Sequence, residues 1–506
     1  MAGSQQAAIR WWQSLGLFLV LLTCYSYFPP RWADWNQNSR LDLVMALVDD
    51  HTLHIDKYVA NTGDYAYHGG HYYSDKAPGL ALLGVPVYAA LRGLLPSELL
   101  LRVQALADGS ESLKTTLRPD GAGLGYDRTL YFVALGVTTF VAVAIPSALL
   151  GVILLHVVMS FGSGAREALA STALYGLGTS AFPYANAFYG HQTSAFLLFA
   201  AFAVLLAVRR GRLTRSWLVL AGFLSGYAAI TEYSTVLIGA ILGVYALAAL
   251  GRALGSLVRL ALGAAPPLVL LVAYDLAAFG TPLPVGYAYS ELWADLHHTG
   301  FLSLTYPRLE ALWGITFGLD RGLFVLSPFL LFALPGYLVL WRDRSRRPEL
   351  WVSLSAPLVF FLFNASSAMW QGGFAVGPRY LVPSLPFLML AVAPGAAWAW
   401  RHLVLRPVLV VAGAWSLFAV WVETIAGQSF PDYTPNPLFD LSLPRLMAGD
   451  VARNVGMLLG LDGWTSLLPL LLALLCVVVA ILSFPSGPVR PIGAPGRVGG
   501  RARWAS

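Results

Sequence analysis

The chain has 506 residues, of which 57% are hydrophobic and only 11% are charged, whereas an ordinary soluble domain carries about 25% charged residues. This composition excludes a soluble globular enzyme and indicates a polytopic membrane protein. The formal net charge is +6, but the basic residues form short clusters between apolar runs, so we expect membrane lipids around the chain and no nucleic-acid partner.

Apolar runs long enough to cross a membrane recur along the whole chain. They lie at 11–28, 129–157, 167–182, 192–208, 257–279, 322–341, 350–366, 380–400, 407–424 and 465–484. The stretch 216–250 is too long for one crossing, and Glu232 at its middle predicts two short spans, 216–231 and 233–250. We therefore expect an all-α polytopic membrane protein of about 12 transmembrane helices.

The sidedness of these spans depends on the run 77–95, which is apolar but contains Pro78, Pro86 and Arg92. If this run does not cross, the arginine clusters between spans fall on the side of the N-terminus, as the positive-inside bias requires. We therefore predict cytoplasmic termini and an interfacial helix at 77–95. The prediction is one membrane-embedded domain, 1–484, with outer segments 29–128, 280–320 and 425–464, and a basic cytoplasmic tail, 485–506.

The first outer segment contains a predicted amphipathic helix, Ser39–Asp50, with Ser39 as a possible N-cap. Its apolar face is expected to exclude Asp42 and Asp49. These acids are either solvated on a membrane-surface helix, or the helix forms one wall of a cleft between lipid and water.

The segment Gly69–Gly79 places Lys76 among aromatic residues, beside Asp75 and before Pro78. A cation at this position is suited to holding a lipid phosphate, although lysine and tyrosine also serve as plain interfacial anchors. The same side of the membrane receives His191, Glu232 and Arg379, together with further acids that include Asp34 and Asp64. Such a cleft can support general-base chemistry on a phosphate-linked substrate, or it can bind an ion.

Motifs for other chemistries do not occur in the sequence. It has no HExxH, P-loop or GxSxG motif and no His/Cys metal-ligand spacing. We therefore predict no metal ligands and no cofactor, with a divalent metal unsupported.

The order of these features resembles the C-type integral-membrane glycosyltransferases, the superfamily of the protein O-mannosyltransferases and the lipid A aminoarabinose transferase. The resemblance is carried by the first span, the long outer loop and the Tyr-x-x-Lys-x-Pro element Tyr73–Pro78. Asp320–Pro328 and Gly377–Pro383 also look like segments of bacterial phospholipid-carrier-dependent glycosyltransferases.

The resemblance implies transfer of a sugar from a polyprenyl-phosphate donor to a lipid, glycan or protein acceptor, with inversion, at the outer face of a bacterial plasma membrane. It implies that Lys76 contacts the donor phosphate, and we add Arg40, Arg379, Tyr73 and His191 as candidates for the same role. A family Asp-Glu pair is replaced here by Gln37-Asn38, so the general base is not transferred. The candidate bases are Asp34, Asp42, Asp64 and Glu232.

Three other functions remain open from the sequence. They are a transporter or flippase for lipid-linked glycans, an O-antigen-ligase-like enzyme, and an assembly subunit without catalytic activity. A transporter requires polar groups at the middle of its spans, whereas the predicted acids gather at the outer span ends.

Overall fold

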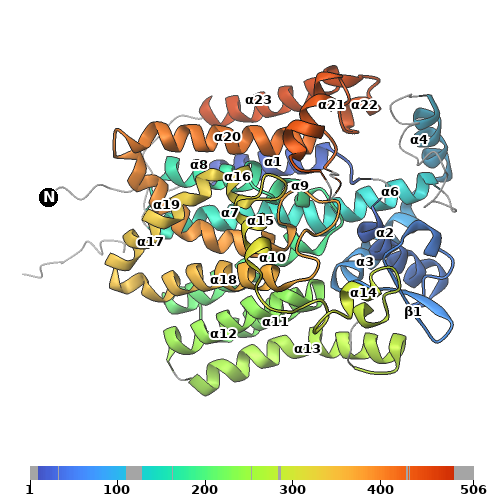
Figure 1. Cartoon of the computed structure of the whole chain (residues 1–506), viewed down its shortest axis with the longest axis horizontal. Coiled ribbons are helices and arrows are strands. Elements are labelled where there is room, and N and C mark those ends of the chain that lie inside the picture. The colour runs from blue at the N-terminus through green and yellow to red at the C-terminus, as the bar shows by residue number, and fades with distance from the viewer. Residues whose placement is uncertain are drawn as a thin grey trace, which may run out of the picture.

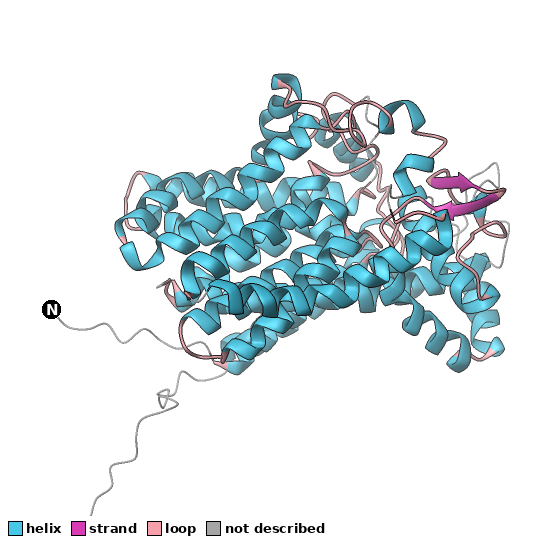
Figure 2. Cartoon of the chain, turned by 90° about the horizontal axis from the view of Figure 1, so that it is seen from below, coloured by secondary structure: helices cyan, strands magenta, loops and turns pink. Residues whose placement is uncertain are grey.

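The computed structural model describes residues 10–31, 34–109, 128–161, 163–251, 253–282, 286–428, 431 and 434–483. Helices lie side by side in one elongated bundle, and a two-stranded hairpin with several long loops gathers at one end of it (Figures 1 and 2). We call this end, which carries residues 65–74, the loop end. The predicted tail 485–506 and residues 110–127 of the first outer segment lie outside the described residues.

The bundle is built from the longer helices. In chain order they are α1 (Trp11–Tyr27), α6 (Arg128–Thr139), α7 (Ile145–Ser160), α8 (Ala165–Leu177), α10 (Gly190–Arg209), α11 (Leu218–Thr231), α12 (Val236–Leu250), α13 (Ala253–Phe279), α17 (Ala333–Arg342), α18 (Arg347–Ser366), α19 (Leu385–Trp400), α20 (Leu405–Ile425) and α23 (Leu468–Ser483).

Shorter elements fill the long connections. They are α2 (Trp35–Met45), β1 (Tyr65–His68), β2 (His71–Ser74), α3 (Gly79–Leu94), α4 (Ser97–Gly109), α9 (Ala181–Ala185), α14 (Ala294–His297), α15 (Leu309–Phe317), α16 (Leu323–Leu326), α21 (Leu443–Met447) and α22 (Val455–Leu458). The hairpin is antiparallel and pairs Tyr65 with Ser74 and His68 with His71.

Among the described residues, seven helices are long and apolar enough to cross a membrane, which confirms an all-α, polytopic integral membrane protein. They cover Thr129–Ser160, Gly190–Arg209, Tyr233–Leu250, Leu254–Phe279, Arg344–Ser366, Arg379–Trp400 and Leu405–Ile425. An eighth span would require α3 and α4, which meet at an angle of 100°, to count as one. The expected number of twelve is therefore not reached by long helices in the described part of the chain, because runs such as α8 and α11 form helices of only 13 and 14 residues.

The predicted break inside 216–250 is confirmed. Helix α11 ends at Thr231, Glu232 has extended backbone angles, and α12 begins at Val236. The carboxylate of Glu232 is thereby placed at a junction between two helices.

The amphipathic helix predicted over 39–50 begins four residues earlier and is buried on all sides. Asp34 is its N-cap and accepts a hydrogen bond from the backbone N–H of Asn36, so the assignment of Ser39 as N-cap is wrong. Residues 36–45 are all buried, because α3 and the segment 59–61 pack against α2. Asp42 is consequently not solvated.

Helices α11 and α13 approach each other almost to backbone contact. A Cβ atom on Gly222 would lie 2.0 Å from the carbonyl oxygen of Leu260, and one on Gly263 would lie 1.9 Å from that of Val219. Small residues allow this approach between membrane helices, where packing provides much of the association energy.

We expect Gly222→Ala to destabilise the protein by about 1–3 kcal/mol, because the added methyl group must push the two helices apart. Unfolding in mixed micelles measures the change. Gly243→Ala in α12 is the matched control, since a Cβ there meets no atom within 4 Å. Equal stability of the two variants would contradict this account of the α11–α13 contact.

Candidate functional site

Lys76 lies at the loop end, between two carboxylates that the hairpin brings together. Asp64 directly precedes β1 and Asp75 follows β2, and the pairing of Tyr65 with Ser74 places these two acids side by side. The Nζ atom of Lys76 lies 2.9 Å from Oδ2 of Asp64 and 3.1 Å from Oδ1 of Asp75. Lys76 is only 6% exposed, so the cation is held almost out of water.

The second predicted outer segment, 280–320, also reaches this lysine, through residues 286–297. The ring of Tyr287 lies 5.6 Å from Nζ of Lys76, within the range of a cation–π contact. The indole N–H of Trp293 donates a hydrogen bond of 3.0 Å to Oδ1 of Asp64. Sequence reasoning missed Tyr287 and Trp293, since they lie more than 200 residues from the lysine motif.

The charges of this group depend on one another. Burial alone would lower the pKa of Lys76, but the two neighbouring carboxylates raise it above its usual value, so Lys76 stays charged. Burial would raise the pKa of Asp64, yet Lys76 and the Trp293 hydrogen bond hold it below its usual value. Burial, assisted by the charge of Asp64, raises the pKa of Asp75 to about 6 despite the attraction of Lys76.

A second buried ion pair lies next to the first. Nη2 of Arg40, on α2, lies 2.8 Å from Oε1 of Glu232, and Nη1 donates a hydrogen bond to the carbonyl oxygen of Ala77. This closeness depends on Gly79, because a Cβ there would lie 2.7 Å from the backbone of Ile230 and Thr231. The chain just after Lys76 is therefore pressed against the end of α11, which carries Glu232.

His191 and Arg379 lie in an aromatic cluster beside this ion pair. Nδ1 of His191 lies 3.7 Å from Oε1 of Glu232, and its ring contacts those of Tyr184, Tyr189 and Tyr380. The guanidinium of Arg379 lies over the rings of Tyr189 and Tyr380, at 5.6 and 5.1 Å. Its positive charge also helps to lower the pKa of Asp64, which connects the two halves of the site.

Asp34 lines a small open pocket at the edge of this cluster. Its carboxylate accepts hydrogen bonds of 2.8 and 3.0 Å from the hydroxyl of Tyr189 and forms an ion pair of 2.5 Å with Arg31. The pocket has about 260 Å³ of free space, part of it open solvent, and is also lined by Gln37 and Gln428. Gln428 belongs to the third predicted outer segment, so residues from 29–128 and 425–464 meet here.

Two of the sequence candidates, Asp42 and Tyr73, make contacts with uncharged residues. Asp42 accepts hydrogen bonds of 3.0 Å from Asn61 and Tyr131, and its complete burial raises its pKa well above the usual value. Tyr73 packs its ring against Phe279 at 5.3 Å. The remaining candidates, Asp34, Asp64, Glu232, Lys76, Arg40, Arg379 and His191, gather at the loop end.

Sequence reasoning left Asp75 and Tyr189 out of the site. Asp75 is adjacent to Lys76, and the signal that could have found it is the pattern of the hairpin. The segments Tyr65–His68 and His71–Ser74 flank Gly69-Gly70, and two glycines between runs of strand-forming residues are a strong hairpin signal. Both glycines have positive φ angles, as such a turn requires.

The chain is similar to three solved structures of membrane proteins. ArnT from Cupriavidus metallidurans in the apo state is 16% identical, with a TM-score of 0.49, over 93% of this chain and 73% of that chain. The same protein bound to undecaprenyl phosphate gives 14% identity and a TM-score of 0.42 over 93% and 75% of the two chains. The archaeal oligosaccharyltransferase AglB from Archaeoglobus fulgidus, in complex with an inhibitory peptide and a dolichol-phosphate, is 11% identical, with a TM-score of 0.45, over 82% of this chain and 55% of that chain.

No protein-family model matches the chain, and no curated protein matches it.

Proposed function

We propose that this protein is a membrane-embedded glycosyltransferase that moves a sugar from a polyprenyl-phosphate donor to an acceptor hydroxyl. The observation that carries the proposal is the group of cations at one end of an apolar bundle, formed by the buried Lys76 and Arg40 and the half-buried Arg379. Buried charges are costly, and near a membrane they mark functional sites. A lipid-linked phosphate is the substrate that joins an apolar tail to an anion.

In the proposed reaction the three cations bind the donor phosphate. The acceptor oxygen forms a bond to the anomeric carbon while the bond from that carbon to the phosphate oxygen breaks. The electron pair of that bond leaves with the polyprenyl phosphate, whose growing negative charge the cations offset. Because the donor bond is already activated, the step needs no nucleotide.

Asp34 is the proposed general base that takes the proton of the acceptor hydroxyl. Of the four candidate carboxylates, it is the one among the described lining residues of the open pocket. Asp34 is itself paired with Arg31, as Asp64 is with Lys76 and Glu232 with Arg40, so its place in the pocket is what distinguishes it. The hydrogen bond from Tyr189 fixes the Asp34 carboxylate beside the cations.

The proposed site faces the outside of the plasma membrane, with both termini in the cytoplasm. This orientation is supported by the short basic connections at the end of the bundle opposite the hairpin (Figure 1). Arg209 donates a hydrogen bond to the carbonyl oxygen of Ser345, and Arg346 donates one to that of Phe161, so three of these connections lie together. Clustered arginines favour the cytoplasmic side.

The proposed function is tested with the full chain in lipid nanodiscs and a panel of radiolabelled polyprenyl-phosphate sugars. We expect release or transfer of the sugar from at least one donor. Absence of both binding and turnover across the panel, for protein that is folded, would contradict the proposal.

Donor binding should also become tighter as the solution is acidified. At neutral pH the site contains four cations and four carboxylates, namely Lys76, Arg40, Arg379, Arg31, Asp64, Asp75, Glu232 and Asp34. Below about pH 6 Asp75 takes up a proton, which changes the formal charge of the site from zero to +1. The nearby His297 contributes no charge above about pH 4, because burial lowers its pKa to that value.

We therefore expect a donor phosphodiester, whose own charge is constant in this range, to bind about threefold to tenfold more tightly at pH 5.5 than at pH 7.5. Asp75→Asn should bind tightly at both pH values, since the amide mimics the protonated acid. Calorimetric titration measures the dissociation constant of the donor at each of the two pH values. Weaker binding at pH 5.5, or the same pH dependence in Asp75→Asn, would show that another group titrates.

A further inference from the structure

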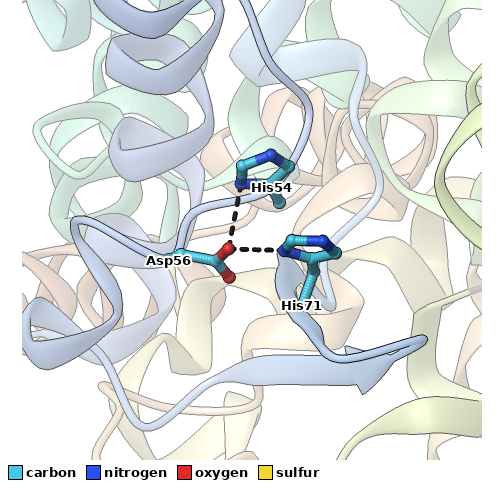
Figure 3. Close-up of side chains that lie close together, drawn as sticks. All are labelled: His54, Asp56 and His71. Atoms are coloured by element: carbon cyan, nitrogen blue, oxygen red, sulfur yellow. Dashed lines mark hydrogen bonds and ion pairs between the residues drawn. The ribbon is translucent and has the colours of Figure 1, made fainter.

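Two histidines and one aspartate of the first outer segment, His54, Asp56 and His71, come together in a cluster that is not part of the proposed transfer site (Figure 3). Oδ2 of Asp56 lies 2.6 Å from Nδ1 of His71 and 3.1 Å from Nδ1 of His54. The two imidazole rings are stacked, with centroids 4.5 Å apart. One atom from each side chain thus falls within a sphere small enough for a single ion, since all three lie within 4.8 Å of one another.

The backbone holds this arrangement in place. Oδ1 of Asp56, the oxygen that faces away from the histidines, accepts a hydrogen bond of 2.7 Å from the backbone N–H of Tyr72. The N–H of Ile55 donates a bond of 2.7 Å to the carbonyl oxygen of the same Tyr72. A carboxylate fixed through its second oxygen is the support that metal-ligating carboxylates require.

We propose that His54, Asp56 and His71 bind a divalent transition-metal ion, with Zn²⁺ as the best match. Imidazole nitrogen and carboxylate oxygen are ligands of Zn²⁺ at about 2.0–2.2 Å, and three protein ligands with water in the fourth position complete a tetrahedron. Hard ions such as Mg²⁺ and Ca²⁺ prefer oxygen ligands alone. The side chain of His71 is 49% exposed, which gives the ion a path from solvent.

The ion would join the loop 51–58 to the hairpin at its turn. Strand β2 begins at His71 and leads directly to Asp75 and Lys76, and Asp64 precedes the partner strand. A metal at His71 therefore restrains the element that sets the spacing of Asp64, Asp75 and Lys76. Its role in this proposal is structural, and the metal takes no part in the transfer step.

Metal binding by the purified full chain in nanodiscs tests the proposal. After treatment with EDTA, we expect the protein to bind one Zn²⁺ per chain, and to give the visible absorption of tetrahedral Co²⁺ when Co²⁺ is added instead. Asp56→Asn and His71→Ala should each weaken binding at least tenfold. Asp56→Asn keeps the oxygen that Tyr72 contacts, so it is expected to fold. His402→Ala, which removes an exposed histidine in the connection between α19 and α20, is the control and should bind as the wild type does.

Two results would overturn the inference. One is that the wild type binds no stoichiometric Zn²⁺. The other is that the wild type and both folded variants bind Zn²⁺ with equal affinity. The structural role has its own measurement, the hydrogen exchange of backbone amides. Exchange in residues 51–74 should slow when Zn²⁺ is added to the wild type and stay unchanged in Asp56→Asn. Since neither measurement uses turnover, this test is independent of the proposed function.

Discussion

In the Lys76→Ala variant, kcat/KM for a polyprenyl-phosphate sugar should fall by about a hundredfold to a thousandfold. Removing one preorganised electrostatic contact to a leaving group typically costs this much. The variant should also be less stable by about 3–5 kcal/mol, because Asp64 and Asp75 would remain buried without their cation. Transfer from the radiolabelled donor measures the first effect, and unfolding in mixed micelles measures the second.

The catalytic loss must be separated from the loss of stability. Lys76→Met combined with Asp64→Asn removes one charge of each sign, so the cluster stays balanced and the protein should regain much of its stability while remaining inactive. Lys57→Ala is the matched control, since Lys57 belongs to the same outer segment, 29–128, and its side chain is 42% exposed. The activity of this variant should be that of the wild type. A balanced double variant with normal turnover would contradict the proposed phosphate site.

The second large effect is expected for Asp34→Asn. An amide cannot accept the proton of the acceptor hydroxyl, and general-base catalysis contributes about 10²–10⁴-fold, so kcat should fall by that factor. The KM for the donor should change little, because the cations that bind the phosphate are untouched. Steady-state kinetics with varied donor and saturating acceptor separate these two constants.

Asp42→Asn provides the comparison for this variant. Both aspartates belong to α2 or its cap and both are buried, but Asp42 contacts Asn61 and Tyr131 through Oδ1 and lies outside the proposed site. Its amide keeps that oxygen, so kcat should stay close to that of the wild type. If Asp34→Asn retained kcat, or raised the donor KM while kcat stayed normal, Asp34 would be a binding residue and the base would have to be sought elsewhere.

The sequence predicts the membrane architecture well, because a span depends on local apolar length. The break at Glu232 is predicted correctly for the same reason, since a charge in the middle of a long apolar run needs a helix junction. The predicted number of twelve spans is not confirmed in the described part of the chain, because composition alone does not distinguish a helix of 13 residues from a full crossing. The start of α2 is missed because residues 36–38 are polar, and only burial by neighbouring elements makes them part of a helix.

The site could be predicted in part for a related reason. Lys76 is recognisable from its neighbours in the sequence, and Glu232 and Arg379 from their places at span ends. The ion pair between Arg40 and Glu232 is not recognisable from the sequence, since the two residues are 192 positions apart. The burial of Asp42 is not predictable either, because helical periodicity assigned its side chain to the polar face, while the structure covers that face with Asn61 and Tyr131.

The distance between Arg40 and Glu232 along the chain also matters while the protein is being made. Lys76 finds both of its acids within the preceding 12 residues, so its half of the site can form as soon as the hairpin is complete. Arg40 must wait for 192 further residues, about 10–40 s at ordinary rates of translation. During that interval the arginine has no acidic partner from α11, so the first outer segment can reach its final position on the bundle only after α11 has been inserted. The order of synthesis thereby makes completion of the site a late event in the assembly of the protein.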